Sequence, residues 1–203
     1  MTRVFLIRHG ETEWNQLGRL QGTSNVKLSS EGIHQAHLLA ERNPFHHPSA
    51  IYSSDLERAV ETAKILADKF NLSVAKMPEL RESSFGDWEG KTISELATEY
   101  PEEFGKFFTA PEKFQPPNGE NFLHCQARVM NALSRIIDYH DNENVLVVSH
   151  GAAIRLMICA ALDVPIHRMW SIGQFNMAVN ALLVDGESIT VELMNSTAHL
   201  HLF

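Results

Sequence analysis

The sequence has little cysteine, no excess of positive charge and no long apolar run. Cys125 and Cys159 are its only cysteines, so no disulfide framework is expected, and each lies in an apolar helical pattern typical of a small core residue. Lysine and arginine number 17 against 25 aspartates and glutamates, and this net charge of -8 argues against nucleic acids and anionic membranes as partners. Neither a signal peptide nor a membrane-spanning segment is recognisable. These absences predict a cytoplasmic globular protein.

What the sequence does contain is an alternation of apolar strands and amphipathic helices. Strands are expected at residues 3–7, 50–53, 72–76 and 145–148, followed by a hairpin of 178–184 and 189–193. Helices are expected at residues 31–41, 92–100, 121–139 and 152–162, and another should run to Phe70 from a cap at Ser54 or Asp55. This order favours a three-layer α/β/α sandwich with a mostly parallel sheet and a C-terminal antiparallel hairpin. We expect a single domain over residues 1–203.

Residues 101–120 interrupt this alternation. The stretch carries Pro111, Pro116 and Pro117 among several phenylalanines, and it shows no clear period. We interpret it as an irregular, lid-like excursion over the strand ends. Its aromatic residues either pack against each other or form the wall of a pocket; they are Phe104, Phe107, Phe108 and Phe114.

The most informative segments are two apolar strands that each end in His-Gly. The first leads into Arg8-His9-Gly10, and the second leads into Ser149-His150-Gly151. In a parallel sheet, ligands bind beyond the carboxyl ends of the strands, so both histidines should meet at one edge. An arginine offers a planar fork of donors to phosphate oxygens, and a histidine nitrogen is a nucleophile. The pair therefore predicts a site that holds and attacks a phosphoryl group. A surface turn at His9 and a satisfied core histidine at His150 are the alternative readings.

Other segments carry residues suited to the same site. Arg58 lies in the first turns of a helix that begins at a strand end, and Glu82 lies in a loop rich in acids and aromatics. Taken together and in order, these segments resemble the histidine phosphatase superfamily, in the branch that includes phosphoglycerate mutases and small-molecule phosphatases. Within it the chain is most similar to bacterial α-ribazole and broad-specificity phosphatases, on the loop 85–90 and on the segment 116–121. In that segment Asn118 and Asn121 depart from the usual residues, and Asn121 is suited to capping the next helix.

The resemblance implies a metal-independent phosphomonoesterase that acts through a phosphohistidine. His9 would be the nucleophile, and Arg8, Arg58 and a charged His150 would surround the phosphate oxygens. Glu82 would protonate the leaving alkoxide and then activate water. Neutral contacts to the substrate would come from Asn15, Gln21, Gly22 and Gly151. Neither a metal nor another cofactor is implied, and the partner would be a small phosphorylated metabolite.

Several alternatives stay open at this point. The acid is the least secure role, since Glu11, Glu13, Asp87 and Glu89 are nearby in the sequence. A phosphoglycerate mutase is one rival function, although the basic residues between positions 83 and 148 occur singly and no Arg-Arg pair is present. A phospho-ligand binding protein without activity is another. The leaving group, which includes α-ribazole, is open, and so is the oligomeric state, which includes a homodimer. The tail with His199 is either mobile or folded over the site.

Overall fold

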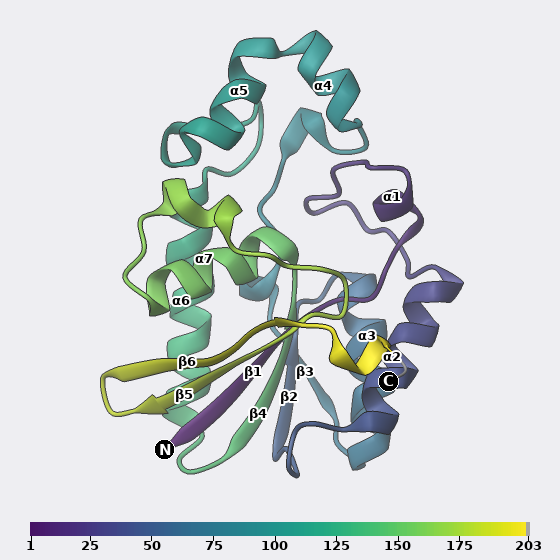
Figure 1. Cartoon of the computed structure of the whole chain (residues 1–203), viewed down its shortest axis with the longest axis vertical. Coiled ribbons are helices and arrows are strands. Elements are labelled where there is room, and N and C mark those ends of the chain that lie inside the picture. Colours follow the sequence, from purple (N-terminus) through teal and green to yellow (C-terminus); the bar gives the residue numbers. More distant parts are fainter. Residues whose placement is uncertain (202–203) are drawn as a thin grey trace.

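The central strand of the sheet leads directly to the predicted site. The computed structural model describes residues 1–201, so the last two positions of the expected domain lie outside the described residues. Strand β1 (Thr2–Arg8) pairs in parallel with β4 (Asn144–Ser149), with Arg8 opposite Ser149. Strands β1 and β4 lie side by side in the sheet (Figure 1), and because of their register His9 and His150 follow them at the same edge.

The six-stranded sheet is mixed. Its order is β3-β2-β4-β1-β5-β6, in which the pairs among β3, β2, β4 and β1 are parallel and β5 is antiparallel to both of its neighbours. The other strands are β2 (Ala50–Ser53), β3 (Val74–Lys76), β5 (Val179–Asp185) and β6 (Ser188–Ser196). The helices are α1 (Glu13–Gln16), α2 (Ser30–Arg42), α3 (Glu57–Phe70), α4 (Ile93–Glu99), α5 (Pro101–Thr109), α6 (Phe122–Tyr139) and α7 (Gly151–Ala161).

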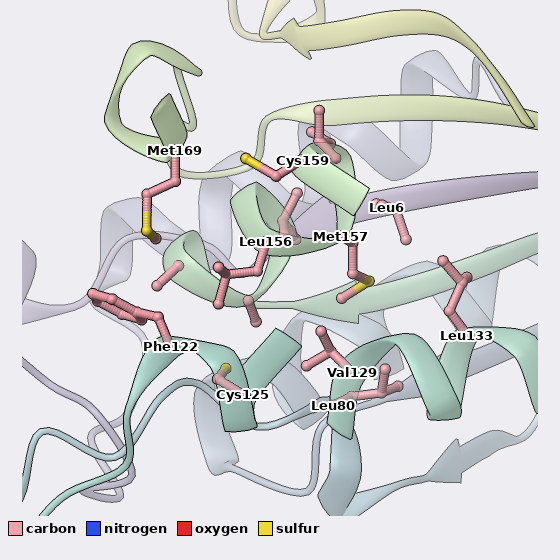
Figure 2. Packing of buried hydrophobic residues seen from close by; sticks show 14 of the residues in the cluster. Leu6, Leu80, Phe122, Cys125, Val129, Leu133, Leu156, Met157, Cys159 and Met169 are labelled. Carbon is pink, nitrogen blue, oxygen red and sulfur yellow. The ribbon is translucent and has the colours of Figure 1, made fainter. Parts of the chain in front are cut away.

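Alternate side chains of β1 enter two separate cores, as a strand buried on both faces requires. Phe5 and Ile7 pack with α2 and α3, whereas Val4 and Leu6 pack with α6 and α7. Figure 2 shows Leu6 near side chains from both helices of the second core, including Val129 and Met157. Each large aliphatic side chain buried in this way contributes roughly 1.5–3 kcal/mol. The predicted three-layer α/β sandwich, with its antiparallel C-terminal strands, is confirmed (Figure 1).

The expectation of an irregular excursion is wrong for much of residues 101–120. Pro101 occupies the first position of α5, where its missing N–H costs nothing, and the helix continues to Thr109. Phe104, Phe107 and Phe108 recur at helical spacing on it and pack against each other. Pro101 and Pro111 therefore begin helical segments rather than preventing them, whereas Pro116 and Pro117 lie in the irregular part of the stretch. Helices α4 and α5 lie beyond the carboxyl ends of the strands (Figure 1). Movement of this segment as a lid stays a prediction.

Of the two predicted helix caps, one is confirmed and the other is wrong. Asn121 caps α6 through a bond from the His124 amide to its Oδ1, as predicted. The cap of α3, in contrast, is Leu56 without a side-chain bond, since the Asp55 carboxylate is paired with Arg81 instead. Both cysteines are buried and free.

The described part of the C-terminal tail packs against helix α2. Its last described turn, Ala198–Leu200, contacts α2, and Arg42 Nη1 donates to the carbonyl oxygen of His201 at 2.6 Å. His199 is buried there, away from the residues that line the predicted site. The described part of the tail, up to residue 201, therefore does not fold over the site. Among residues 1–201, no helix combines the length and the apolar character that crossing a bilayer would require.

Candidate active site

A cavity of about 230 Å³ opens at the carboxyl ends of β1 and β4. Most of the predicted site residues line it; they are Arg8, His9, Asn15, Gln21, Gly22, Arg58, Glu82 and Gly151. His150 is fully buried behind this surface, and its ring centre lies 5.1 Å from that of His9. The fold thus brings the motifs from distant parts of the chain to one place.

The His9 ring presents one unprotonated nitrogen to the cavity. Its Nδ1 lies 2.7 Å from the carbonyl oxygen of Gly10, and because a carbonyl only accepts, Nδ1 carries the proton. Nε2 is then unprotonated and receives a long hydrogen bond of 3.3 Å from Arg58 Nε. Burial, together with the Arg58 and Arg8 charges, holds the pKa of His9 well below its ordinary value. The ring is therefore neutral and nucleophilic at Nε2 near neutral pH.

Arg58 is held beside His9 by backbone carbonyls. Its Nη1 donates to Ser24 at 2.8 Å and its Nη2 donates to Gly22 at 2.7 Å. The loop that carries these carbonyls is anchored by Glu89, which accepts the Thr23 amide at 2.9 Å. Gly22 has a φ of 53°, and a Cβ there would collide with the Glu89 carboxylate. Glu89 is thus an anchor of the loop around Arg58, and it does not line the cavity.

Arg8 contributes a second buried guanidinium. Its Nη1 donates to the carbonyl oxygen of Gln174, while its buried Nε has no partner among the described residues. Burial, and next the charge of Arg155, lower the pKa of Arg8 to about 10, and burial lowers that of Arg58 likewise to about 10. Both groups therefore stay charged at neutral pH, and Arg8 keeps a donor for an anion.

His150 differs from the expectation of a charged ring. Both of its nitrogens are buried without a hydrogen-bond partner in the described part of the chain. Burial is the main cause that holds the pKa of His150 well below its ordinary value, and the Arg58 charge and then His9 add to it. The ring is therefore neutral near neutral pH. Its unpaired nitrogens make it a donor or acceptor available to a ligand.

Acidification is expected to destabilise the protein through these two rings. Because folding lowers both pKa values, the unfolded chain takes up protons first once the pH falls below about 6.5, and the free energy of unfolding then decreases. Above that pH the effect vanishes. At about pH 5.5 the loss should be about 1 kcal/mol for each ring.

Urea unfolding of the wild type and of the variant with both His9→Asn and His150→Asn, at neutral and acid pH, measures this loss. Burial also lowers the pKa of His199, to about 4, and its contribution cancels because both proteins contain it. An equal pH effect in the two proteins would contradict the prediction.

Uncharged residues form another part of the cavity wall. Asn15 Oδ1 accepts bonds from the Thr12 amide at 3.1 Å and from Asn176 Nδ2 at 3.2 Å, which leaves the Asn15 amide nitrogen as its donor to a ligand. Gly151 lies against Arg8, since a Cβ there would stand 3.5 Å from the Arg8 Cζ. Gln21 is buried, and its Oε1 has no partner among the described residues.

Glu82 is the only carboxylate that lines this cavity in the described chain. Its oxygens accept the backbone amides of Ser83, Ala152 and Ala153, each at 3.0 Å, so the side chain also caps the start of α7. Of the other candidate acids, Glu11 accepts from the Gln16 side chain, the exposed Asp87 accepts from Asn118, and Glu13 is exposed on α1 and does not line the cavity. Glu82 is thus the carboxylate whose position suits proton transfer inside the cavity.

Sequence reasoning missed part of the cavity wall. Arg155, one turn after Gly151 on α7, lines it together with Trp170, and Arg19 lines it on another side. The spacing of four residues from Gly151 was the available signal for Arg155, because it puts both on one helix face. Phe107 and Phe108 of α5 also line the cavity, whereas Phe114 is buried in the core. Within residues 1–201, no three histidine, cysteine or acidic side chains converge as a metal site.

Comparison with curated proteins finds relatives along nearly the whole chain. Phosphoserine phosphatase 1 of Hydrogenobacter thermophilus is 36% identical over 200 residues, which cover 98% of this chain and 95% of that protein. A metal-independent phosphoserine phosphatase of Arabidopsis thaliana is 35% identical and covers 98% and 84%. A probable phosphoglycerate mutase of Yersinia pestis is 34% identical and covers 98% and 95%.

Solved structures agree with this fold. Bacillus stearothermophilus YhfR superposes with a TM-score of 0.94 at 35% identity, covering 99% of this chain and all of that one. A phosphoserine phosphatase of Entamoeba histolytica, solved with bound phosphoserine, gives 0.90 at 30% identity and covers 99% and 100%. A putative α-ribazole-5'-P phosphatase of Escherichia coli gives 0.86 at 31% identity and covers 97% of both chains.

The family model of the histidine phosphatase superfamily, branch 1, matches residues 4–197. This range contains both His-Gly motifs, Arg58 and Glu82. The resemblance drawn from these segments is therefore confirmed, including its relation to α-ribazole phosphatases and to phosphoglycerate mutase-like proteins. The chain belongs to the histidine phosphatase superfamily and is a phosphatase of the histidine type.

Proposed function

We propose that the protein is a metal-independent phosphomonoesterase that hydrolyses a small phosphorylated metabolite through a phosphohistidine at His9. The observation that carries the proposal is the neutral His9 ring, whose unprotonated Nε2 faces a cavity between two charged arginines. The Nε2 lone pair forms a bond to phosphorus as the ester P–O bond breaks, and Glu82 gives its proton to the departing alkoxide. Water then attacks the phosphohistidine and returns a proton to Glu82, and inorganic phosphate leaves.

The charges in the cavity support catalysis without a divalent ion. Arg58 is buried, Arg8 is half-buried with its Nε covered, and both are charged, while Asn15 and the Gly151 amide add neutral donors. In a loose transition state the negative charge sits on the peripheral phosphoryl oxygens, which is where such donors act. Removal of one preorganised donor of this kind costs roughly 3–4 kcal/mol of barrier. The guanidinium groups thus do the work that a metal ion does in other phosphatases.

We expect the enzyme to stay active when divalent metal ions are chelated. We also expect hydrolysis of the substrate to be faster than transfer of its phosphoryl group to another acceptor. The test is a panel of phosphomonoesters, with p-nitrophenyl phosphate, phosphoserine and α-ribazole phosphate included, assayed with and without excess EDTA. Full activity in EDTA is expected. A large loss that one added metal restores would contradict the mechanism and favour metal-assisted hydrolysis.

A phosphoglycerate mutase is the second candidate, because several curated relatives carry the name of a probable phosphoglycerate mutase. Conversion of 3-phosphoglycerate to 2-phosphoglycerate, primed with the bisphosphate, measures it in the same preparation. Mutase turnover should be far below the best hydrolysis in the panel. Comparable turnover would replace the proposed phosphomonoesterase by a phosphotransferase.

A further inference from the structure

Arg155 is a guanidinium at the cavity wall that the proposed chemistry does not use. Its Nε donates to the carbonyl oxygen of Ile172 at 2.8 Å, and its Nη1 donates to that of Gly151 at 3.2 Å. The group lies over the Trp170 ring, with its Cζ 5.3 Å from the ring centre. Trp170 in turn donates to the carbonyl oxygen of Phe107 at 2.7 Å, which ties the short turn Ile166–Ser171 to α5. The guanidinium is therefore rigidly placed, and Nη2 has no hydrogen-bond partner within residues 1–201.

This cation has no carboxylate bonded to it in the described part of the chain, although the charge of Glu82 acts on it through space. No ion pair of Arg155 occurs in the described chain, and the one acid of the cavity, Glu82, is already bonded to three backbone amides. Burial lowers the pKa of Arg155 from its ordinary value, but an arginine keeps its charge at neutral pH. A half-buried charge without a partner is costly unless a ligand provides one.

The position of Arg155 relative to Arg8 defines where that ligand charge would lie. A Cβ on Gly151 would be 3.3 Å from Arg155 Nη1 and 3.5 Å from Arg8 Cζ, so the two guanidinium groups flank the same glycine. An anion on Arg155 would therefore sit beside a phosphate on Arg8, toward the wall formed by Trp170 and Phe107. Two neighbouring cations are best neutralised by one substrate with two anionic groups a few bonds apart.

We propose that Arg155 binds a carboxylate of the substrate, so that the enzyme prefers short phosphomonoesters that carry a carboxylate near the ester oxygen. This rests on the proposed phosphomonoesterase function. Nη2 is unpaired in the described chain and Nη1 keeps a second N–H beside its bond to Gly151, so this edge of the guanidinium can bind the two oxygens of a planar carboxylate. The small cavity, of about 230 Å³, suits such a compact substrate.

A matched substrate pair tests this assignment. 3-Phosphoglycerate carries a carboxylate where glycerol 3-phosphate carries a hydroxymethyl group, so kcat/KM on the two reports the carboxylate contact. The wild type should prefer 3-phosphoglycerate. Arg155→Gln should lower kcat/KM on 3-phosphoglycerate by roughly 10- to 100-fold more than on glycerol 3-phosphate, mainly through KM, as loss of a charge-assisted hydrogen bond predicts. Arg155→Lys, which keeps the charge but not the fork, should recover part of the preference.

Arg168→Gln is the matched control, because this exposed arginine lies in the same turn as Trp170 and outside the cavity. It should leave both rates unchanged. Equal losses of Arg155→Gln on both substrates would assign Arg155 to the phosphate or to the fold and overturn the proposal. So would a wild type without a preference for 3-phosphoglycerate. A wild type that hydrolyses neither these substrates nor p-nitrophenyl phosphate would instead contradict the proposed function itself.

Discussion

Replacing His9 with alanine is expected to abolish turnover while the fold stays intact. In the cavity no other side chain offers an unprotonated nitrogen to the phosphoryl group, since the arginines are charged and the His150 ring lies behind His9. Loss of a covalent nucleophile typically lowers kcat by about 10⁴-fold or more. The His9→Ala variant should keep the wild-type unfolding transition above about pH 7, where the His9 ring is neutral in both states.

The intermediate gives a second readout of the same substitution. Rapid acid-free quenching of the wild type with a labelled substrate should trap acid-labile phosphate on the protein, and this label should be missing in His9→Ala. His34→Ala is a suitable control, because His34 is exposed on α2 and does not line the cavity. Near-normal turnover of an aryl phosphate by His9→Ala would show that the nucleophile is another group.

The site was predictable from the sequence where backbone topology alone decides placement. An apolar strand that ends in His-Gly puts its histidine at the carboxyl edge of the sheet, and two such strands in parallel put both histidines together. Arg58 follows for the same reason, because it lies just after β2 at the start of α3. The positions of these residues are set by where strands end and helices begin, and local sequence patterns predict those points well.

The residues that sequence reasoning missed depend on contacts between distant segments. Arg155 became part of the wall because the turn that carries Trp170 folds back onto α7. The Glu89 carboxylate accepts bonds from the amide and the hydroxyl of Thr23, a contact between distant segments that removes it from the candidate acids. Helix α5 was missed for a different reason: its one proline, Pro101, indicates a helix stop in the sequence although it lies at the helix start, and a helix of nine residues is too short to show a clear period. The neutral state of His150 depends on how deeply the ring is buried and on how close it lies to the Arg58 charge. Neither is known from the sequence before the fold is known.

Replacing Glu82 with glutamine is expected to slow alkyl phosphates far more than p-nitrophenyl phosphate. An alkyl or sugar alkoxide is a poor leaving group and needs a proton as its bond to phosphorus breaks, whereas a nitrophenolate hardly needs one. A positioned general acid contributes roughly 10²- to 10⁴-fold, and this factor should appear only with the alkyl substrates. The acid limb of the pH profile for the alkyl substrates should change as well.

Glu82 also has a structural role, so the experiment must distinguish a loss of stability from a loss of proton transfer. Because Glu82 accepts the Ala152 and Ala153 amides, Glu82→Gln also weakens the cap of α7 and is expected to lower stability. A general loss of folded enzyme lowers both rates by the same factor, so the ratio of alkyl to aryl turnover is free of it. Asp87→Asn is the matched control, since this exposed carboxylate in the same loop bonds only to the Asn118 side chain. It should change neither rate nor ratio.

An equal fall of both rates in Glu82→Gln would leave Glu82 with a structural or electrostatic role. The proton donor would then have to be a carboxylate outside the cavity wall, such as Glu11, or water held by the cavity. Glu11 is bonded to Gln16 and Ser29, so reaching the leaving oxygen would require the loop after β1 to move. A selective fall of the alkyl rate, in contrast, assigns the proton to the one carboxylate that the described fold places beside His9 and the start of α7.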